Sequence, residues 1–428
     1  MSLPTAPGHA PLDRELVLRE IASRIPGRPD PRLRMVWLIL ILAGSASFAL
    51  LLATEPARAW GAWGANLVFF LGIPLGAAAL ASAIRLGNGR WGGPVLRIAE
   101  ALSAFLPWGI LFVLVMLVGG IWTYLPWTHE AVLARQRPYL NVPFLYARTL
   151  LGLGLLWWLV RDMVRTSLRR DLFLLRDHVG PELRATYEKL TRDWKGEVAE
   201  EQRERDRLAM RSPQVALTFA VVFTVFAWDF IMSITPTWVS GLFGWWVFMG
   251  AFLTGIATTA LLATRLRKHR RLEAWITPAH FWDLGKLLFG FSIFWVYLFW
   301  SQYLPIWYAN LPEETWWVFL RFEDPWRRLA FVVFGLVFLL PFLGLMNLRT
   351  KRSPFWLALF SLVSLAGMWL ERLLLVMPSI NPDRMWVGLP ECGVALGFLG
   401  VFGLAVQGFL AKYPAIKVTD VLAGGQGH

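Results

Sequence analysis

Apolar runs of about 20 residues recur along the whole chain, and they decide what the chain can fold into. A helix of about 20 residues crosses a hydrocarbon core of roughly 30 Å. Inside that core the backbone amides need partners within the protein, so such runs predict packed helices. The chain is therefore expected to be an all-α integral membrane protein with about ten transmembrane helices. They are expected at 35–54, 60–84, 95–122, 143–160, 213–234, 241–264, 283–304, 327–346, 354–377 and 389–411.

The composition agrees with a membrane fold and excludes a string of soluble domains. Hydrophobic residues make up 56% of the 428 positions and charged residues only 17%, whereas soluble domains carry roughly 25% charged residues. Many of the 25 tryptophans lie at the ends of the apolar runs, at the level where amphipathic rings meet lipid headgroups.

The basic residues predict the orientation of the chain. The segments 1–34, 85–97, 161–212, 265–282, 347–353 and 412–428 carry 32 Lys and Arg residues, and the alternate segments carry seven. Basic loops stay on the cytoplasmic side, so both termini of this multi-pass protein are expected in the cytoplasm. The net charge of +13 reflects this topology, and nucleic acid is excluded as a partner because the basic residues form no single patch.

Five segments follow from these spans. They are a cytoplasmic segment 1–34, helices one to four in 35–160, a charged cytoplasmic insertion 161–212, helices five to ten in 213–411, and a cytoplasmic tail 412–428. The insertion is expected to be a solvated helical hairpin broken at Gly180-Pro181 and at Gly196, with partner docking as the alternative.

Small residues and prolines predict how the helices pack and where they bend. Gly72 with Gly76, and Gly393 with Gly397, have the spacing that lets two helix backbones approach closely. Pro305 is expected to end or bend the seventh helix.

Metal centres are not expected within the chain. It has one cysteine, Cys392, and six histidines, none in the middle of a span. No disulfide or iron–sulfur site can be built from one cysteine, and no histidine pair can clamp a haem between the helices. If the protein takes part in redox chemistry, haem and iron–sulfur groups are therefore expected only in partner subunits, and no catalytic residue is assigned.

Ionisable groups in the spans are the candidate functional residues, since a charge at the membrane centre costs about 2.5–3.5 kcal/mol on insertion scales. An outer group is expected to bind a quinone or carry protons. The alternative for Arg148 and Asp229 is a structural ion pair. Glu391 is expected to lie in the headgroup region. The outer group comprises Asn66, Arg148, Asp229, Glu371 and Arg372.

An inner group is expected to form a proton path, and hydrogen bonding between helices is the alternative. Two polar stripes at helical spacing, one on the seventh and one on the ninth helix, are expected to face protein or water rather than lipid. The ninth-helix stripe is Ser361, Ser364, Met368 and Glu371. The inner group comprises Glu100, His280, Asp283, Lys286, Tyr297 and Ser301, and Gly290 lies on the seventh-helix stripe.

Two stretches resemble a known family. The first is WDFIMS at 228–233 followed by LFGWWVFMGAF at 242–252; the second runs from DLGKLLF at 283–289 through FWSQY at 299–303 to IWYANLPEET at 306–315. Over residues 228–315 the chain looks like the second polysulfide-reductase-like (NrfD-like) membrane subunit of bacterial alternative complex III. Asp229, Asp283, Lys286 and Gln302 match by position, and Pro305 departs from the pattern.

The resemblance implies an architecture and an activity. It implies two four-helix bundles, spans two to five and six to nine, flanked by the first and tenth helices. It implies assembly with a sister NrfD-like membrane subunit, a periplasmic iron–sulfur subunit and c-type haem subunits, and oxidation of menaquinol or another quinol. In such complexes the sister subunit is the usual holder of the quinol site.

The leading hypothesis is therefore a membrane subunit of a quinol:cytochrome c type oxidoreductase. It would shape a quinone site or a transmembrane proton path without a covalently bound cofactor of its own. A secondary transporter is the first alternative, although no pair of interrupted spans supports it. A structural scaffold whose buried charges only pair with one another is the second.

Overall fold

The computed structural model describes residues 14–130 and 132–423. Within them every regular element is helical and no strand occurs. Ten helical segments are long and apolar enough to cross a membrane. The predicted all-α integral membrane fold is thus confirmed, and the chain is a multi-pass membrane protein.

The ten spans follow the predicted order along the chain. They are α2 (Pro31–Thr54), α3 (Pro56–Leu86), a span made of α4 (Gly93–Leu102), α5 (Leu106–Val115) and α6 (Ile121–Tyr124), α7 (Val142–Leu175), α9 (Glu197–Phe230), α10 (Phe243–His269), α11 (Pro278–Ala309), a span made of α13 (Arg327–Phe334) and α14 (Leu340–Gly344), α16 (Pro354–Ile380) and α17 (Leu389–Lys412). Five shorter helices lie outside the spans: α1 (Arg14–Ser23), α8 (Pro181–Leu190), α12 (Pro312–Phe322), α15 (Leu348–Arg352) and α18 (Val418–Leu422).

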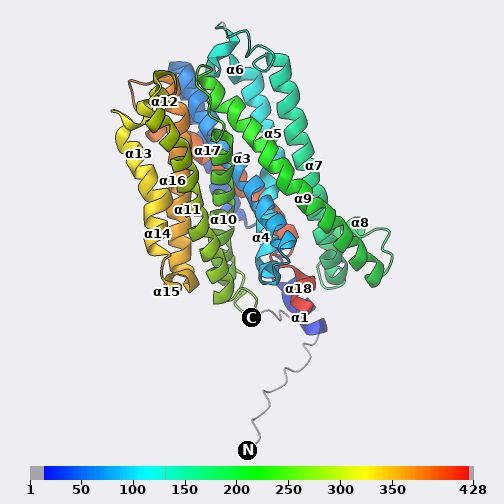
Figure 1. Cartoon of the computed structure of the whole chain (residues 1–428). Helices are drawn as coiled ribbons and strands as arrows, with labels where there is room; N and C mark the ends of the chain where they lie inside the picture. The colour runs from blue at the N-terminus through cyan, green and yellow to red at the C-terminus, as the bar shows by residue number, and fades with distance from the viewer. Residues whose placement is uncertain (1–13, 131, 424–428) are drawn as a thin grey trace, which may run out of the picture.

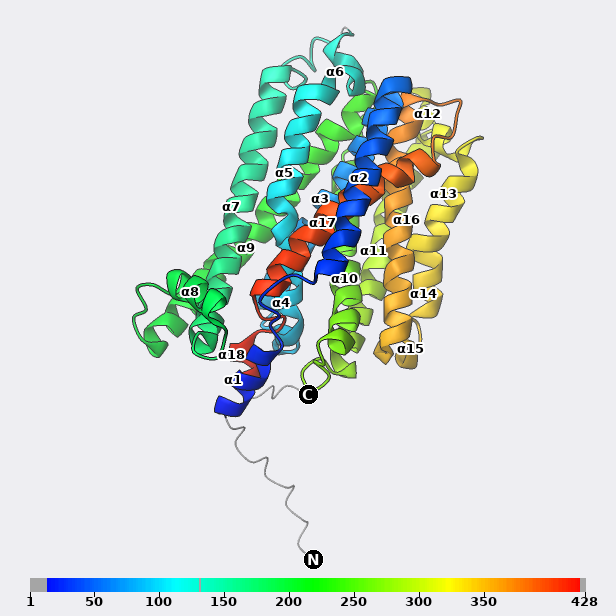
Figure 2. The ribbon, with the colours of Figure 1, turned by 180° about the vertical axis from the view of Figure 1, so that it is seen from behind.

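The spans form two groups of four, which lie side by side in Figure 1. The first group is α3, the α4–α6 span, α7 and α9; the second is α10, α11, the α13–α14 span and α16. The two groups meet mainly where α3 packs on α10 and α16. The first and tenth spans, α2 and α17, pack on each other and on α3 (Figure 2). Helices α1, α8, α15 and α18 lie at one end, here called the α1 end, and α6 and α12 lie at the other.

Glycines hold the centre of the fold together. A Cβ at Gly76 would lie 2.1 Å from the carbonyl oxygen of Ala251, and one at Gly255 would lie 2.3 Å from the amide nitrogen of Ala77. The backbones of α3 and α10 are therefore in direct contact, as the Gly72–Gly76 spacing predicted. Gly397 on α17 meets Gly44 on α2 in the same way, so the tenth span also packs through its predicted glycine pair.

The segment 161–212 is built differently from the predicted hairpin. Helices α7 and α9 both continue beyond the spans, to Leu175 and from Glu197, and only α8 lies between them. The breaks at Gly180 and Gly196 are where the sequence predicted them. Ion pairs such as Arg169–Glu200, with Nε and Oε2 2.8 Å apart, join the two extensions, so these charges stabilise helices that had been expected to be only solvated.

Pro305 does not end α11, which continues to Ala309. The helix stops at Asn310, whose φ of 49° lies in the left-handed region that terminates helices. Of the two outcomes expected at Pro305, ending of the helix was therefore wrong, and bending stays a prediction. The parts of the terminal segments at 1–13 and 424–428 lie outside the described residues.

Candidate functional site

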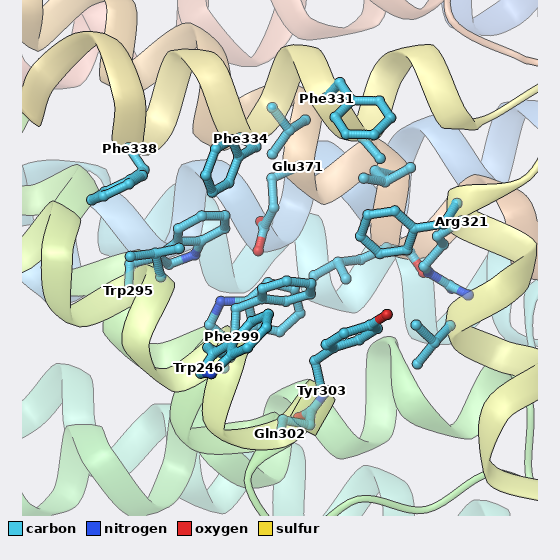
Figure 3. Close-up of a pocket in the computed structure, with 18 of the residues that line it drawn as sticks. Trp246, Trp295, Phe299, Gln302, Tyr303, Arg321, Phe331, Phe334, Phe338 and Glu371 are labelled. Atoms are coloured by element: carbon cyan, nitrogen blue, oxygen red, sulfur yellow. The ribbon is translucent and has the colours of Figure 1, made fainter. Parts of the chain in front are cut away.

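An aromatic cavity of about 630 Å³ lies in the second helix group. Its walls come from α10, α11, α12, α16 and the α13–α14 span (Figure 3). Ring side chains dominate the lining, and only a few polar groups reach it. The lining includes Trp246, Trp295, Phe299, Gln302, Tyr303, Trp317, Arg321, Phe331, Phe334, Phe338 and Glu371.

Glu371 is the buried carboxylate of this cavity. It is 1% exposed, and in Figure 3 its carboxylate points into the space among the rings. Its only close charged neighbour in the described chain is Arg372, with Nη1 2.8 Å from Oε2. That approach lacks hydrogen-bond geometry, and neither carboxylate oxygen has a hydrogen-bond partner among the described residues. Since a buried polar group normally has such a partner, Glu371 is available to a ligand.

Two indole donors lie on the cavity wall, and neither N–H makes a hydrogen bond of full geometry in the described chain. The Trp295 N–H is near enough to Glu371 to interact with its carboxylate, whereas Trp246 has no acceptor among the described residues. Trp295 lies close to the Glu371 side chain in Figure 3. The cavity therefore offers an acceptor and two donors within a wall of rings, which is the character of a small-molecule site.

Arg372 belongs to the protein side of the site. Its guanidinium donates from Nη2 to the carbonyl oxygen of Val247 over 3.0 Å. A Cβ at Gly250 would lie 2.6 Å from this nitrogen, so the glycine leaves the space that the guanidinium occupies. Arg372 thus anchors α16 to α10 and places positive charge behind Glu371.

Arg321 was not predicted as a site residue, since in the sequence it counted only as a basic residue of an outer loop. It is 3% exposed, and its guanidinium lies 3.4 Å from the ring centroid of Trp317. It donates to the carbonyl oxygens of Trp317 and Leu375 and to the Ser379 hydroxyl. Burial lowers its pKa well below the usual value. No motif marks it, because α12 is too short to appear as a span.

The ninth-helix stripe faces the interior, as predicted. Ser361, Ser364 and Met368 are fully buried on the same helix as Glu371. Both serine hydroxyls lack hydrogen-bond partners among the described residues. The stripe therefore extends from the cavity toward the α1 end as a row of unpaired polar atoms.

Asn66 joins the two helix groups rather than the cavity. Its side-chain oxygen accepts from the indole N–H of Trp369 on α16 over 2.9 Å, and its amide donates to the carbonyl oxygen of Ala62. Both of its polar ends are engaged, so its position indicates a structural role.

Arg148 and Asp229 form the predicted ion pair in the first helix group. Arg148 Nη2 and Nε lie 2.7 and 2.8 Å from the two carboxylate oxygens. Tyr139 donates its hydroxyl to the same carboxylate over 2.9 Å, and the Arg148 guanidinium lies 3.9 Å from the Tyr139 ring centroid. The outer group of the sequence prediction is therefore divided, with Asp229 paired in one bundle and Glu371 beside the cavity of the other.

Glu100 lies in a buried ionic network at the α1 end. It accepts from both Arg85 and Arg97, and Arg97 also donates to Asp171 over 2.7 Å. The Ser167 hydroxyl accepts a hydrogen bond from Arg85, and the Ser167 carbonyl oxygen accepts one from Arg97. The sequence prediction named Glu100 but missed its arginine partners and Asp171.

The residues of the predicted inner path on α11 lie in different environments. Asp283 Oδ1 lies 2.6 Å from Lys286 Nζ, and His280 Nδ1 accepts from the Thr277 amide in the helix cap. Ser301 is half-buried, but Gly290 is exposed and Tyr297 is 58% exposed on the surface of the chain. Gly290 and Tyr297 thus lie on the surface of the chain, and the expectation that the stripe faces protein or water rather than lipid stays a prediction there.

Glu391, at the start of α17, is fully buried. Its two carboxylate oxygens lie 2.6 and 3.2 Å from Nε and Nη2 of Arg58. It also accepts from the Gly388 amide. The carboxylate that was expected in the headgroup region is thus a buried ionic link between α3 and α17.

Comparison with known proteins adds no family assignment: no model of a known protein family and no curated protein matches the chain. Among the described residues, no group of three or more His, Cys, Asp and Glu side chains has a metal-binding arrangement. The function is therefore inferred from the geometry of the cavity.

Replacing Arg148 with Met is expected to lower the free energy of unfolding by about 3–5 kcal/mol, since it leaves Asp229 buried without its cation. Thermal or denaturant unfolding of the purified protein in detergent measures the change. The double variant Arg148→Met/Asp229→Leu, which removes both charges, should recover most of the loss. A single variant as stable as the wild type would contradict a structural role for the pair.

Proposed function

We propose that this protein is a quinol-handling membrane subunit of an electron-transfer complex and that the cavity around Glu371 holds the quinone ring. The observation that carries the proposal is a buried carboxylate with no hydrogen-bond partner in the described chain, facing an aromatic cavity. Ionisable groups inside a membrane protein mark sites of proton or substrate handling.

The shape and lining of the cavity suit a quinone. Aromatic side chains pack well on a flat ring, and Trp246, Trp295 and Phe299 offer such surfaces. Tyr297, Trp300 and Phe331 line the cavity and are also more than half exposed on the outside of the chain. An opening at these residues would let an isoprenoid tail leave toward the lipid while the ring stays inside.

The polar groups suit the oxidation of a quinol. Oxidation of one quinol to the quinone releases two electrons and two protons. In the proposed reaction Glu371 accepts the two hydroxyl protons one after the other, passing the first on before it takes the second, and the two electrons leave for an iron–sulfur or haem group of a partner subunit. The indole N–H groups of Trp246 and Trp295 would hold the ring oxygens in place.

The buried serines of α16 extend this proposal to proton movement. Ser364 and Ser361 lie 7 and 10 residues before Glu371, about two and three helical turns toward the α1 end, and their hydroxyls have no hydrogen-bond partner in the described chain. Hydroxyls with intervening waters can pass a proton onward. We place the α1 end in the cytoplasm, as the basic loops predict, and the membrane as a bacterial inner membrane.

For the other candidate carboxylates we propose a structural role, as in the scaffold alternative. Asp229, Glu100 and Asp283 are each paired with a cation at close distance. These residues are proposed to stabilise the fold, and Glu371 alone is assigned a chemical role. No described feature favours the transporter alternative.

Photoaffinity labelling tests the cavity. An azido-quinone added to the full chain should label peptides containing Trp295 to Tyr303 and Phe331 to Phe338, because these segments line the cavity. Val333 faces the cavity and Val332 is exposed. Val333→Phe should therefore cut labelling several-fold, and Val332→Phe should leave it unchanged. Labelling elsewhere, or equal labelling of both variants, would contradict the site.

Purification from native membranes tests the complex. A tagged chain isolated in mild detergent should bring down subunits with c-type haem absorbance and an iron–sulfur signal in electron paramagnetic resonance. It should also carry quinol oxidation activity that Glu371→Gln reduces at least tenfold, since the amide cannot accept the proton. Isolation of the chain alone, with neither signal, would argue against the assembly.

A further inference from the structure

A second and larger cavity lies on the other side of the second helix group. It is a groove of about 1150 Å³ between α2 and α17 on one side and α3, α10 and α16 on the other. These helices are seen from that side in Figure 2. Small-ligand pockets usually measure about 300–1,000 Å³, so the groove has room for a larger molecule.

The wall of the groove is apolar along most of its length. It follows α17 from Ala411 near the α1 end to Cys392 near the opposite end. Aromatic and aliphatic side chains from four helices line it, including Phe69, Ile73, Leu262, Leu365, Leu399 and Phe402. A surface of this kind fits long hydrocarbon chains.

The α1 end of the groove is cationic. Arg28, Arg265, His269 and Arg270 line it, and Asp30 is the one acidic residue among the described lining residues. Arg28 already pairs with Glu182, whereas no described carboxylate forms a salt bridge with Arg265 or Arg270. The groove therefore ends in positive charge that the described chain does not neutralise.

Arg270 is a charged residue of this end that has only a neutral hydrogen-bond partner. Its guanidinium donates to the carbonyl oxygen of Arg24, a neutral partner. Burial lowers the pKa of Arg270 to about 10, so the side chain still carries its charge at neutral pH. An anion beside it would offset the cost of that burial.

Two unpaired polar atoms lie near the same end. The indole N–H of Trp37 and the side-chain oxygen of Gln407 are buried and lack partners in the described chain. Gly403 leaves the space for the Trp37 ring, since a Cβ there would lie 2.5 Å from it. The Gln407 amide is fixed by donating to the carbonyl oxygen of Asp30. These groups are held in place for a polar ligand.

We infer that the groove binds an anionic phospholipid. Its phosphate lies among Arg265, Arg270 and the Trp37 indole N–H, and its acyl chains follow the apolar wall along α3 and α17. Basic pockets between spans at the cytoplasmic side recognise such headgroups. A quinone tail is neutral and would gain nothing from the cations. The inference does not depend on the proposed quinol site, since the two cavities share helices α10 and α16 but no lining residue.

Native mass spectrometry of the full chain tests the inference. The purified protein is exposed to phosphatidylglycerol or phosphatidylcholine with the same acyl chains. The wild type should retain phosphatidylglycerol about tenfold more than phosphatidylcholine, given the attraction of each basic residue to an anionic lipid. Arg265→Gln/Arg270→Gln should lose this preference. Arg349→Gln/Arg352→Gln, on α15 at the same end of the chain, should keep it.

Trp37→Phe provides an independent test because it keeps an aromatic ring near Gly403 and removes the indole N–H together with the five-membered ring. It should weaken retention of phosphatidylglycerol several-fold without changing the fold. Equal retention of the two lipids, or an unchanged preference in the Arg265/Arg270 variant, would overturn the inference. So would a quinone found in the groove in place of a phospholipid.

Discussion

The absence of water in the membrane interior governs where this protein can carry charge. A buried ion without a partner is so costly that most buried carboxylates here meet an arginine. Asp229 pairs with Arg148, Glu391 with Arg58, and Glu100 with Arg97. Glu371 departs from this pattern, since its contact with Arg372 leaves both oxygens without a hydrogen bond in the described chain. The exception lies beside a cavity, and that coincidence is the basis of the functional proposal.

The fold explains why the cavity forms where it does. Glycines bring α3 and α10 into backbone contact, which closes the centre of the molecule. On the far side of α10 the neighbouring helices carry large rings that keep the backbones apart. The α13–α14 span also contains a π-helical turn at Gly335–Leu339, which packs on α16. Such turns often occur at functional sites, and here the turn adjoins the cavity wall at Phe338.

The sequence predicted what depends on length and local spacing. Apolar runs located the ten spans, glycine pairs located the close contacts, and depth along the helices matched Arg148 with Asp229. It did not predict contacts made by residues outside the predicted spans, such as Asp171 in the segment 161–212. Arg97 and Asp171 are 74 residues apart, and Arg321 lies in a helix too short to be recognised. The exposure of Tyr297 on α11 was also not predicted, because helical spacing shows which residues share a face but not which neighbour covers it.

The central claim is that Glu371 takes a proton when quinol is oxidised. Infrared difference spectroscopy of the native complex, cycled electrochemically between quinol and quinone, measures this directly. The account predicts a protonated-carboxyl band that appears on quinol oxidation, is absent in Glu371→Gln and persists in Asp229→Asn. A band that survives in Glu371→Gln, or disappears only in Asp229→Asn, would contradict it.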